Sequence, residues 1–441
     1  MSGIAGLMLE KGFSVTGSDV KENGSIRELR RMGAEIFIGH AAANIGSSEV
    51  VVYSSAIKND NPELLAAKSA GIPVIKRAQA LAELMRDKTV ITVTGSHGKT
   101  TTTSLASYLL LEAGLSPSMA IGGILKNTGR NASRGKGEFF VAEADESDGS
   151  FLYYRPKYSI ITNVDREHLD YYGTFDNAAA AYRQFIDKTL PGGCLFCCSD
   201  DDNLSRLVEG YPGKLVKFGL RPGADVRAGN IIIKGLASDF DVFFRDEPIG
   251  RFHLALGGEH NISNSLAVIG LARELEISPE VVKRVFTGYK GAGRRLDIKF
   301  RDKGITVIDD YAHHPTEIKA SLAALRYTDA KRIIAVFQPH RFTRTRLLME
   351  EFGKCFEGAD VVVLTDIYPA SEPAIPGITA AAVVERIKDN FPGKTVEFCV
   401  KENIPELVNR IAVPGDTVVM LGAGDIVKVS NDVVEKIKNR N

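Results

Sequence analysis

The sequence predicts an α/β protein of three domains, on three observations. Short apolar segments typical of buried strands alternate with helix-favouring segments along most of the chain, an order that predicts parallel sheets covered by helices. The 441 residues allow about two to four domains of ordinary size. A glycine-rich loop between an apolar strand and a helix marks the central segment. We therefore expect a Rossmann-like domain at 1–88, a phosphate-loop domain with an antiparallel subsheet at 89–290, and a second Rossmann-like domain at 291–441.

In the first segment, helical and strand patterns alternate up to Lys88. The pattern predicts helices at Ser2–Glu10, Ser25–Arg31 and Pro62–Ser69, and strands at Phe13–Thr16, Glu35–Ile38, Val50–Tyr53 and Ile72–Ile75. Such an alternation implies a parallel sheet. Residues 76–88 are polar and favour a helix, and we interpret them as a connector to the next segment.

The central segment begins with nearly all-apolar strands, which are typical of a sheet covered on both faces. These are expected at Thr89–Val93, Phe139–Ala142 and Tyr158–Asn163. After Lys214–Gly219 the pattern changes to the alternation typical of an antiparallel meander. The meander is expected at Val226–Lys234, Asp239–Arg245 and Gly250–Leu256, followed by helices at about Asn261–Glu274 and Pro279–Phe286.

The third segment returns to alternating strands and helices. Its strands are expected at Ile305–Asp309, Arg332–Phe337, Ala359–Thr365, Val396–Cys399 and Thr417–Leu421, and its helices at Pro315–Leu325 and Ala380–Asp389. Gly422-Ala423-Gly424-Asp425 is interpreted as a tight strand-to-helix turn rather than a dinucleotide fingerprint. Ligands of such sheets bind at the carboxyl ends of the strands, so we look for functional residues there.

Composition excludes several classes of protein. Lys plus Arg number 55 and Asp plus Glu number 55, so no overall field favours nucleic acid or an anionic membrane. Apolar runs fall far short of the roughly 18 residues of a bilayer span, and the first residues lack a signal-peptide pattern. We expect a cytoplasmic protein, a monomer or a weak dimer, with small-molecule substrates. Cys194, Cys197 and Cys198 are interpreted as part of a buried strand, because no second pair or spaced histidine completes a metal site.

The strongest motif is the segment Thr94-Gly95-Ser96-His97-Gly98-Lys99-Thr100-Thr101, which follows a strand and opens a helix running from about Thr100 to Ala113. A strand before the loop and a helix after it are the structural context that a phosphate loop requires. The glycines allow backbone N–H groups and the helix N-terminus to face a phosphate. Lys99 would reach the β and γ phosphates, and Thr100 would offer its hydroxyl to Mg²⁺. The spacing is two residues shorter than the general motif, and the competing interpretation is a glycine turn before an ordinary helix.

Acidic residues follow the next two strands, where a metal-binding carboxylate is expected. Glu143 ends the strand that leads into Glu-Ala-Asp-Glu-Ser-Asp, and His168 lies in Asp-Arg-Glu-His-Leu-Asp after the third strand. We predict a Mg²⁺ site formed by Thr100, Glu143 and His168. The other acidic residues of both runs are interpreted as solvated loop.

Seven segments occur in one order along the chain: T-G-S-H-G-K-T-T, E-A-D-E-S-D, T-N-V-D-R-E-H-L-D, G-E-H-N-I-S-N-S-L-A, G-A-G-R-R-L-D, D-D-Y-A-H-H-P-T-E and F-Q-P-H-R-F-T-R-T-R. In this order they resemble the Mur ligases of peptidoglycan synthesis, over nearly the whole chain. The last segment resembles the members that join L-alanine to UDP-N-acetylmuramate more than the member that recycles murein tripeptide.

The resemblance implies an ADP-forming ligase that uses ATP and Mg²⁺ and proceeds through an acyl phosphate. The catalytic residues implied are Lys99, Glu143, His168, Arg341 and Arg344. ATP would be held by Gly95, Ser96, His97, Gly98, Lys99, Thr100, Thr101, Asn261, Asn264, Arg295 and Asp310. The incoming amino acid and the reacting carboxylate would lie near His340, Arg341 and Arg344. The family's role in the cell wall further implies a part in cell shape and division.

The histidines and arginines of the third segment also have simpler structural interpretations. His313 and His314 precede a helix that begins with proline, and both could serve only to cap it. Arg341, Arg344 and Arg346 could form one solvated helix face.

The first segment departs from the family pattern. Asp19 fits the acidic residue that closes the second strand of a nucleotide-binding unit, but the glycine loop and first strand that should precede it would lie before Met1. We therefore expect this domain to lack that strand and loop. UDP would then be held by Asp19, Ser54, Ala56 and Ile57. A glycine loop formed by residues 1–6 after a strand would contradict this expectation.

Three alternative functions remain open from the residues alone. A phosphate-loop kinase or NTPase would need no amine substrate, but it leaves the basic cluster of the third segment unexplained. A nucleotide-binding regulatory module would tolerate loss of Lys99. A dinucleotide-dependent oxidoreductase is the least favoured, because only Asp19 and the Gly422 turn resemble its motifs.

Overall fold

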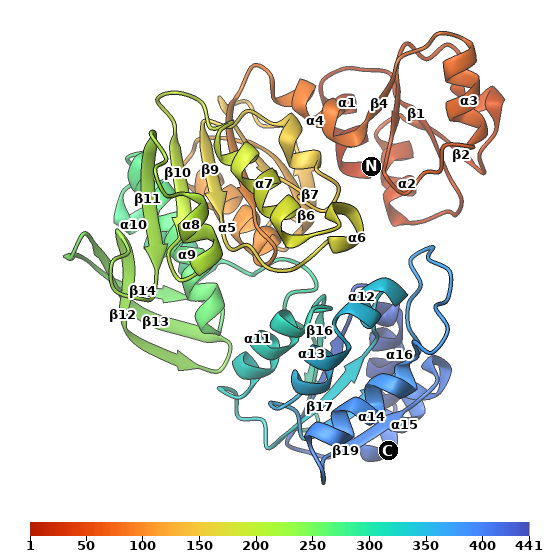
Figure 1. The fold of residues 1–441 in the computed structure, drawn as a ribbon, viewed down its shortest axis with the longest axis vertical. Coiled ribbons are helices and arrows are strands. Elements are labelled where there is room, and N and C mark those ends of the chain that lie inside the picture. The colour runs from red at the N-terminus through yellow and green to blue at the C-terminus, as the bar shows by residue number, and fades with distance from the viewer. Residues whose placement is uncertain (441) are drawn as a thin grey trace. The chain divides into compact units, whose positions relative to one another are not determined.

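The computed structural model describes residues 1–440, which divide into two compact units. The first unit contains Met1–Ala228, Val242–Ile249 and Ser263–Val285. The second contains Gly229–Asp241, Gly250–Ile262 and the chain from Phe286 onward. In Figure 1 the colour runs from the N-terminus to the C-terminus, so each residue range can be found by its number. No helix within residues 1–440 combines the length and the apolar character that a bilayer span requires.

The strands of the first 88 residues form two separate parallel pairs. β1 (Thr16–Asp19) pairs with β2 (Glu35–Ile38), and β3 (Val51–Tyr53) pairs with β4 (Val74–Lys76). The accompanying helices are α1 (Ser2–Glu10), α2 (Gly24–Arg31), α3 (Pro62–Ser69) and α4 (Arg77–Met85), with a 3₁₀ turn, η1, at Ala42–Ile45. None of the four strands contains a fully buried residue.

The first strand was placed three residues too early by its apolar pattern. Phe13 lies outside the strand and is 55% exposed, whereas the polar residues 16–19 pair with β2. Asp19 is consequently the last residue of the strand, the position expected of the acidic residue. Residues 2–10 are helical, so residues 1–6 form no glycine loop, and no strand precedes α1 among the described residues.

The central sheet has ten strands in the order β14-β13-β12-β11-β10-β9-β5-β8-β6-β7. β5 (Thr89–Thr94) lies between β8 (Phe139–Glu143) and β9 (Tyr158–Ile161), parallel to both. Their apolar side chains are buried, which confirms the expectation of a sheet covered on both faces. β6 (Ser118–Leu125) and β7 (Arg130–Ser133) form an antiparallel pair that the sequence pattern did not reveal, because polar residues and glycines break its apolar run.

The cysteine cluster lies in β10 (Cys194–Cys198), all of whose residues are buried. Burial raises the pKa of the Cys197 thiol well above its ordinary value, as expected of inert core cysteines. β11 (Lys214–Gly219) continues the parallel order. The meander follows as β12 (Val226–Lys234), β13 (Ala237–Phe244) and β14 (Glu247–Leu254), which are neighbours joined by two-residue turns.

Helices connect these strands. The central elements are α5 (Lys99–Glu112), η2 (Ser150–Tyr153), α6 (Leu169–Tyr172), α7 (Phe175–Ile186), α8 (Asp202–Leu207), α9 (Glu259–Glu274) and α10 (Pro279–Gly288).

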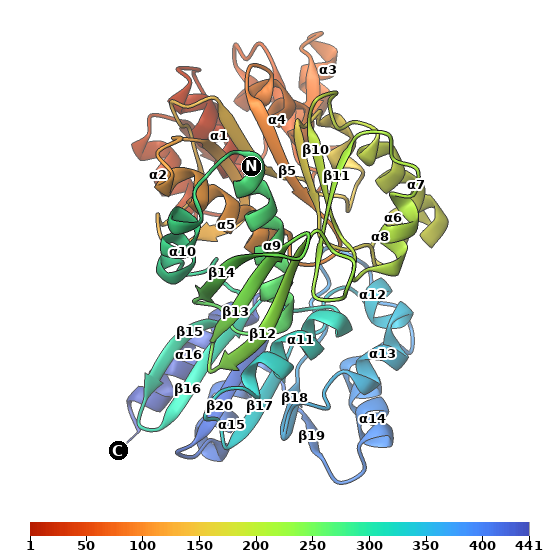
Figure 2. The same ribbon diagram turned by 90° about the vertical axis from the view of Figure 1, so that its left-hand side faces the viewer.

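The C-terminal sheet has six strands in the order β15-β16-β20-β17-β18-β19, which Figure 2 shows side by side. Only β15 is antiparallel to its neighbour. The strands are β15 (Asp297–Asp302), β16 (Ile305–Asp310), β17 (Arg332–Phe337), β18 (Val361–Leu364), β19 (Thr395–Phe398) and β20 (Asp416–Leu421). The helices are α11 (Pro315–Leu325), α12 (Phe342–Leu347), α13 (Met349–Lys354), α14 (Ala380–Asn390), η3 (Lys401–Asn403), α15 (Ile404–Ile411) and α16 (Ile426–Lys438).

Helices cover both faces of this sheet. Alternate residues of β17 point to opposite sides: Ile333 and Phe337 pack with α11, α13 and α14, and Ile334 and Val336 pack with α15 and α16. The two hydrophobic cores confirm the doubly wound, Rossmann-like arrangement. Gly422 follows β20 with φ +148° and leads into α16, as expected of a strand-to-helix turn.

Candidate functional site

The phosphate loop lies between β5 and α5, and its two glycines have backbones that other residues rarely adopt. Gly95 has φ +130° and Gly98 has φ +84°. A Cβ on Gly95 would collide with the hydroxyl of Thr162, and one on Gly98 would lie 2.7 Å from Oδ1 of Asn264. Both positions therefore require glycine, for backbone conformation and for space.

Residues after β9 hold the loop, and the sequence did not reveal them. Ser96 N–H donates to the Asn163 carbonyl (3.1 Å), and His97 N–H donates to Asn163 Oδ1 (2.8 Å). The Asn163 amide and the Thr162 hydroxyl donate to the His97 carbonyl, at 3.0 and 2.5 Å. Because Asn163 occupies the first two N–H groups, the N–H groups at the start of α5 are the ones placed for an anion.

Lys99 is held at the start of α5 by three acceptors. Its Nζ donates to the carbonyls of Gly95 (2.6 Å) and Ser96 (3.1 Å) and lies 2.8 Å from Oε1 of Glu146. Burial lowers the pKa of Lys99, but the neighbouring carboxylates, chiefly Glu146, outweigh this effect and raise it. Lys99 is therefore charged at any physiological pH.

Glu143 ends β8 beside the loop, as predicted. Its Oε1 accepts a hydrogen bond from the Thr100 hydroxyl (3.1 Å), and its Oε2 accepts one from Gly122 N–H (2.8 Å). A side chain on Gly122 would displace the Glu143 carboxylate. The Thr100 hydroxyl and the Glu143 carboxylate are thus held together at the carboxyl edge of the sheet.

Two acidic residues interpreted as solvated loop are buried instead. Glu146 is 2% exposed and Glu167 is 7% exposed. Nε2 of His168 lies 3.4 Å from Oε1 of Glu146 and 3.7 Å from Oε2 of Glu167. The interpretation was wrong for Glu146 because its burial depends on Lys99 and His168, which are distant from it in sequence. Burial lowers the pKa of His168, but the hydrogen bond to Glu146 and the charge of Glu167 outweigh it and raise the pKa above its ordinary value.

The predicted nucleotide residues on α9 lie one turn apart, and both are buried. Asn264 packs against Gly98 of the phosphate loop, whereas the Asn261 amide donates to the Gly257 carbonyl (2.8 Å) and anchors the start of its helix.

Arg295 and Asp310 belong to the second unit. The Arg295 guanidinium lies 5.1 Å from the centre of the Tyr311 ring. The Asp310 carboxylate, 4% exposed, accepts hydrogen bonds from the N–H groups of Leu296 (2.8 Å) and Ala312 (2.7 Å). Burial raises its pKa to about 6, against the opposing charge of Arg295.

The predicted amino-acid residues lie together before and within α12. Arg344 NH1 lies 3.1 Å from Nδ1 of His340, and the His340 ring stacks on Tyr368 with centroids 5.5 Å apart. Burial and the charges of His313, Arg344 and Arg341 lower the pKa of His340 to about 3. His340 is therefore neutral at physiological pH and accepts a hydrogen bond from Arg344.

His313 and His314 have the capping geometry of the simpler interpretation. His314 is the N-cap of α11 and accepts from Thr316 N–H (3.4 Å). The Glu317 carboxylate accepts from His313 N–H (3.0 Å) and His314 N–H (3.4 Å). Capping thus uses the His314 ring and the backbone of both residues, and any residue could supply the two backbone N–H groups.

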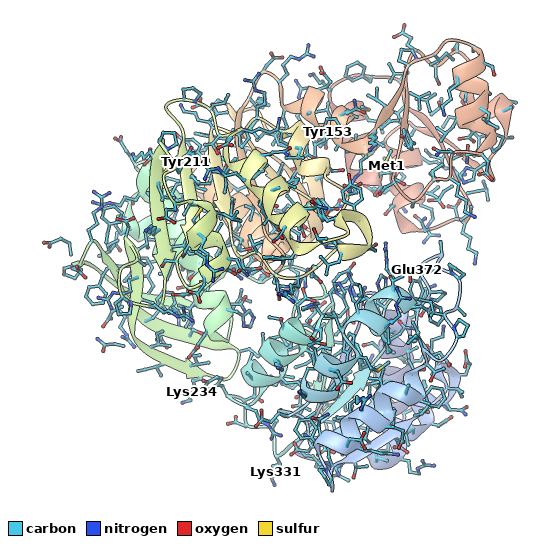
Figure 3. All side chains as sticks on the ribbon, viewed as in Figure 1. Met1, Tyr153, Tyr211, Lys234, Lys331 and Glu372 are labelled. Atoms are coloured by element: carbon cyan, nitrogen blue, oxygen red, sulfur yellow. The ribbon has the colours of Figure 1, made fainter. Side chains whose placement is uncertain are left out.

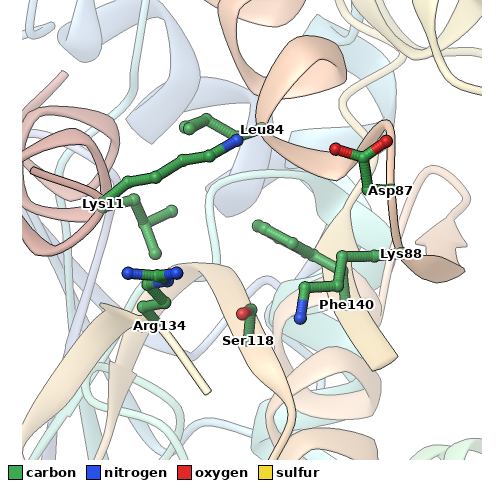
Figure 4. A pocket seen from close by; sticks show the side chains of 8 residues that line it. Lys11, Leu84, Asp87, Lys88, Ser118, Arg134 and Phe140 are labelled. Carbon is green, nitrogen blue, oxygen red and sulfur yellow. The ribbon is translucent and has the colours of Figure 1, made fainter. Parts of the chain in front are cut away.

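The candidate UDP residues follow the N-terminal strands. Asp19 ends β1, and Ser54, Ala56 and Ile57 lie in a turn after β3, closed by a bond from Ile57 N–H to the Ser54 carbonyl (3.0 Å). A separate hollow of about 250 Å³ contains none of the predicted residues. Figure 4 shows its lining, Leu7, Lys11, Leu84, Asp87, Lys88, Ser118, Arg134 and Phe140.

Comparison with known proteins gives matches along almost the entire chain. Three family descriptions match in succession: "Mur ligase family, catalytic domain" at residues 1–89, "Mur ligase middle domain" at 93–272 and "Mur ligase, glutamate ligase domain" at 294–424. The chain is 42% identical over 439 residues to the UDP-N-acetylmuramate--L-alanine ligase of Syntrophus aciditrophicus (strain SB), covering 99% of this chain and 91% of that protein. It is 44% identical over 439 residues to the ligase of the same name from Aquifex aeolicus (strain VF5), covering 99% and 95%. The chain belongs to the Mur ligase family.

A solved Mur ligase has the same three-domain α/β fold. The crystal structure of the UDP-N-acetylmuramate-alanine ligase from Thermotoga maritima superposes with a TM-score of 0.84 at 29% identity, covering 99% of this chain and 96% of that one. Mur ligases are ATP-dependent, so membership implies ATP and a divalent cation.

The residues of this Mur ligase fit a divalent cation. Hard cations prefer carboxylate and hydroxyl oxygens, and Thr100 and Glu143 supply both at the edge of the phosphate loop. Glu146, Glu167 and His168 each offer one ligand atom, all within 4.8 Å of one another. Oε2 of Glu146 is buried without a hydrogen-bond partner within the described residues, as expected of an oxygen with capacity for a cation.

We expect Asp310 to make the stability of this Mur ligase depend on pH. Its folded pKa of about 6 exceeds its ordinary value of 3.8, so the folded state binds the proton more tightly. The resulting stability is present below pH 3.8 and is lost as pH rises through 6. We expect the wild type to gain about 1 kcal/mol relative to Asp310→Asn when pH falls from 7 to 5.

Urea unfolding of both proteins at the two pH values measures this difference. Asp302→Asn, an exposed aspartate of β15, is the matched control and should show no such change. An equal gap between wild type and Asp310→Asn at pH 5 and pH 7 would refute the predicted shift.

Proposed function

We propose that this chain joins L-alanine to the carboxylate of UDP-N-acetylmuramate, with ATP as the energy source and Mg²⁺ as the cation. The products are ADP, phosphate and a new amide bond, in the synthesis of peptidoglycan precursors. The observation that carries the proposal is identity of 42–44% over 439 residues to ligases of that name, combined with a phosphate loop of intact geometry.

The chemistry requires activation of a carboxylate in water. A carboxylate oxygen attacks the γ-phosphorus of ATP, the bond to the β-phosphate oxygen breaks, and an acyl phosphate and ADP form. The amine of L-alanine then attacks the acyl carbon and loses a proton, and the tetrahedral intermediate expels phosphate. Every phosphorylated species on this path is anionic, so preorganised positive groups supply most of the catalysis.

The chain offers such groups in both units. Lys99 would bind the phosphates of ATP, beside the N-terminus of α5. Arg341 and Arg344 would stabilise the negative charge of the reacting carboxylate and orient the amino acid. When bound, Mg²⁺ would neutralise phosphate oxygens, held by Thr100, Glu143 and His168.

Other residues would bind the nucleotide, the amino acid and the UDP group. Asn261, Asn264, Arg295 and Asp310 would contact the nucleotide, and His340 the amino acid. Asp19, Ser54, Ala56 and Ile57 would hold the UDP group. We place the limits of the three domains at 1–88, 89–290 and 291–441. A cytoplasmic location fits the use of ATP.

The direct test measures ADP and phosphate release from purified protein with each substrate omitted in turn. We expect release only when ATP, Mg²⁺, L-alanine and UDP-N-acetylmuramate are all present, with one phosphate per amide bond formed. Release with neither L-alanine nor the UDP-sugar would identify a plain NTPase. Release that requires murein tripeptide in place of L-alanine would identify the recycling reaction instead.

A further inference from the structure

The loop after β18 packs against the segment that carries the candidate amino-acid residues. Tyr368 N–H donates to the Pro339 carbonyl (2.8 Å), and Arg341 N–H donates to the Tyr368 carbonyl (2.8 Å). His340 and Tyr368 thereby form an isolated parallel bridge, and their rings stack with an interplanar angle of 13°. The loop thus fixes both the backbone and the ring of His340.

Glu372 extends this contact to the start of α12. Its Oε2 accepts a hydrogen bond from Thr343 N–H (3.0 Å), and its Oε1 accepts one from the Thr343 hydroxyl (2.7 Å). The residue before α12, Arg341, makes no side-chain cap of its own. Glu372, labelled in Figure 3, therefore caps this helix from 29 residues away and satisfies a terminal N–H group.

Arg341 has a backbone that needs such support. Its φ is +71° and its ψ is +138°, a region that L-residues avoid at a cost of about 1–3 kcal/mol. The strain persists only where the surroundings determine the conformation. Here the Arg341 carbonyl accepts from Thr345 N–H (3.1 Å) and the Thr345 hydroxyl (2.8 Å), while Glu372 lies 3.7 Å from the Arg341 guanidinium.

We propose that Glu372 is a positioning residue for the ligase reaction: it holds Arg341 in its strained conformation and fixes the start of α12, so that Arg341 and Arg344 face the reacting carboxylate and the amino acid. Its carboxylate is only 17% exposed and uses both oxygens. The inference rests on the proposed function, since it assigns the orientation of two residues of that site.

The test compares Glu372→Gln with wild type in the ADP-release assay, varying L-alanine and ATP separately. Glutamine keeps the size, and its oxygen can still accept from Thr343 N–H, but an uncharged N–H₂ donor replaces the second carboxylate oxygen. The variant therefore loses the charged acceptor of the Thr343 hydroxyl and the attraction for Arg341. We expect kcat/KM for L-alanine to fall on the order of 10- to 100-fold, with KM for ATP unchanged. Glu372→Asp retains two oxygens and the charge and should recover part of the loss.

Two further variants separate positioning from stability. Glu385→Gln removes an exposed glutamate of the same domain, paired with Lys388, and should leave both constants unchanged. Thr343→Val removes the hydroxyl donor, and its effect on kcat/KM should not add to that of Glu372→Gln. The melting temperature of Glu385→Gln should match that of wild type, and loss of the cap in Glu372→Gln should lower it by no more than a few degrees.

The experiment distinguishes failure of the proposed ligase function from failure of the positioning role of Glu372. If wild type forms no ADP in response to L-alanine, the proposed function fails whatever Glu372 does. If wild type is active and Glu372→Gln matches Glu385→Gln, the positioning role is overturned. Equal losses in KM for ATP and for L-alanine, with a lower melting temperature, would also overturn it, because they would indicate a purely structural role.

Discussion

Replacing Lys99 by alanine is expected to lower kcat for ADP formation by about 10³-fold. The Lys99 ammonium is a charged group at the start of α5 that already lies among acceptors, so a phosphate oxygen can replace Glu146 as its partner. Without it, the γ-phosphoryl group would lose the positive side chain that we propose for it. Steady-state ADP release with saturating L-alanine and UDP-N-acetylmuramate measures the effect.

Lys388→Ala is the matched control for this variant. Lys388 is an exposed residue paired with Glu385, and its removal should leave kcat unchanged. Retention of most of the wild-type rate by Lys99→Ala, in a protein with an unchanged melting temperature, would exclude Lys99 from the phosphate site and favour a regulatory nucleotide-binding role.

Glu143→Gln is expected to lower kcat by about 10²-fold at moderate Mg²⁺ and to shift the Mg²⁺ dependence to higher concentrations. Glutamine preserves the size of the side chain, and its single carbonyl oxygen can still accept from Gly122 or Thr100. It removes the negative charge that a divalent cation requires. A titration of activity against Mg²⁺ at fixed ATP separates the loss of charge from a change in fold.

Glu138→Gln provides the comparison, because Glu138 immediately precedes the same strand and is exposed. It should show the wild-type Mg²⁺ dependence. If Glu143→Gln also showed it, Glu143 would not be a cation ligand, and Glu146 with Glu167 and His168 would remain as the candidate group.

The sequence predicted those parts of the site that are determined locally. The strand, the two glycines, Lys99 and Thr100 are consecutive, and the conformation of such a loop is set by its own residues. Glu143 was predictable because it ends an apolar strand, and the ends of parallel strands meet at one edge.

The missing parts depend on contacts between distant segments. Asn163 closes the phosphate loop from 66 residues away, and nothing in its neighbouring residues distinguishes it from a loop asparagine. The burial of Glu146 follows from its pairing with Lys99, 47 residues away. The contacts of Glu372 with Thr343 were invisible for the same reason.

Apolar content misplaced the first N-terminal strand, although it placed the other three within two residues. The pattern placed a strand at Phe13–Thr16, whereas the backbone pairs at residues 16–19. Strand pairing depends on main-chain geometry, and apolar periodicity reports it only where one face is buried. The parallel strands β5, β8 and β9 are buried and were placed within two residues, whereas β6 and β7 were not predicted.

The two-stranded N-terminal sheets are expected to unfold locally more readily than the central sheet. Each strand there has a single hydrogen-bonded neighbour, and Val20 and Ile38 at their ends are 65% and 51% exposed. Opening such a pair breaks few bonds and uncovers little new apolar surface, so its local free energy of unfolding is well below that of the buried central sheet. Amide hydrogens of the first 88 residues should therefore exchange through opening events that leave the phosphate loop closed.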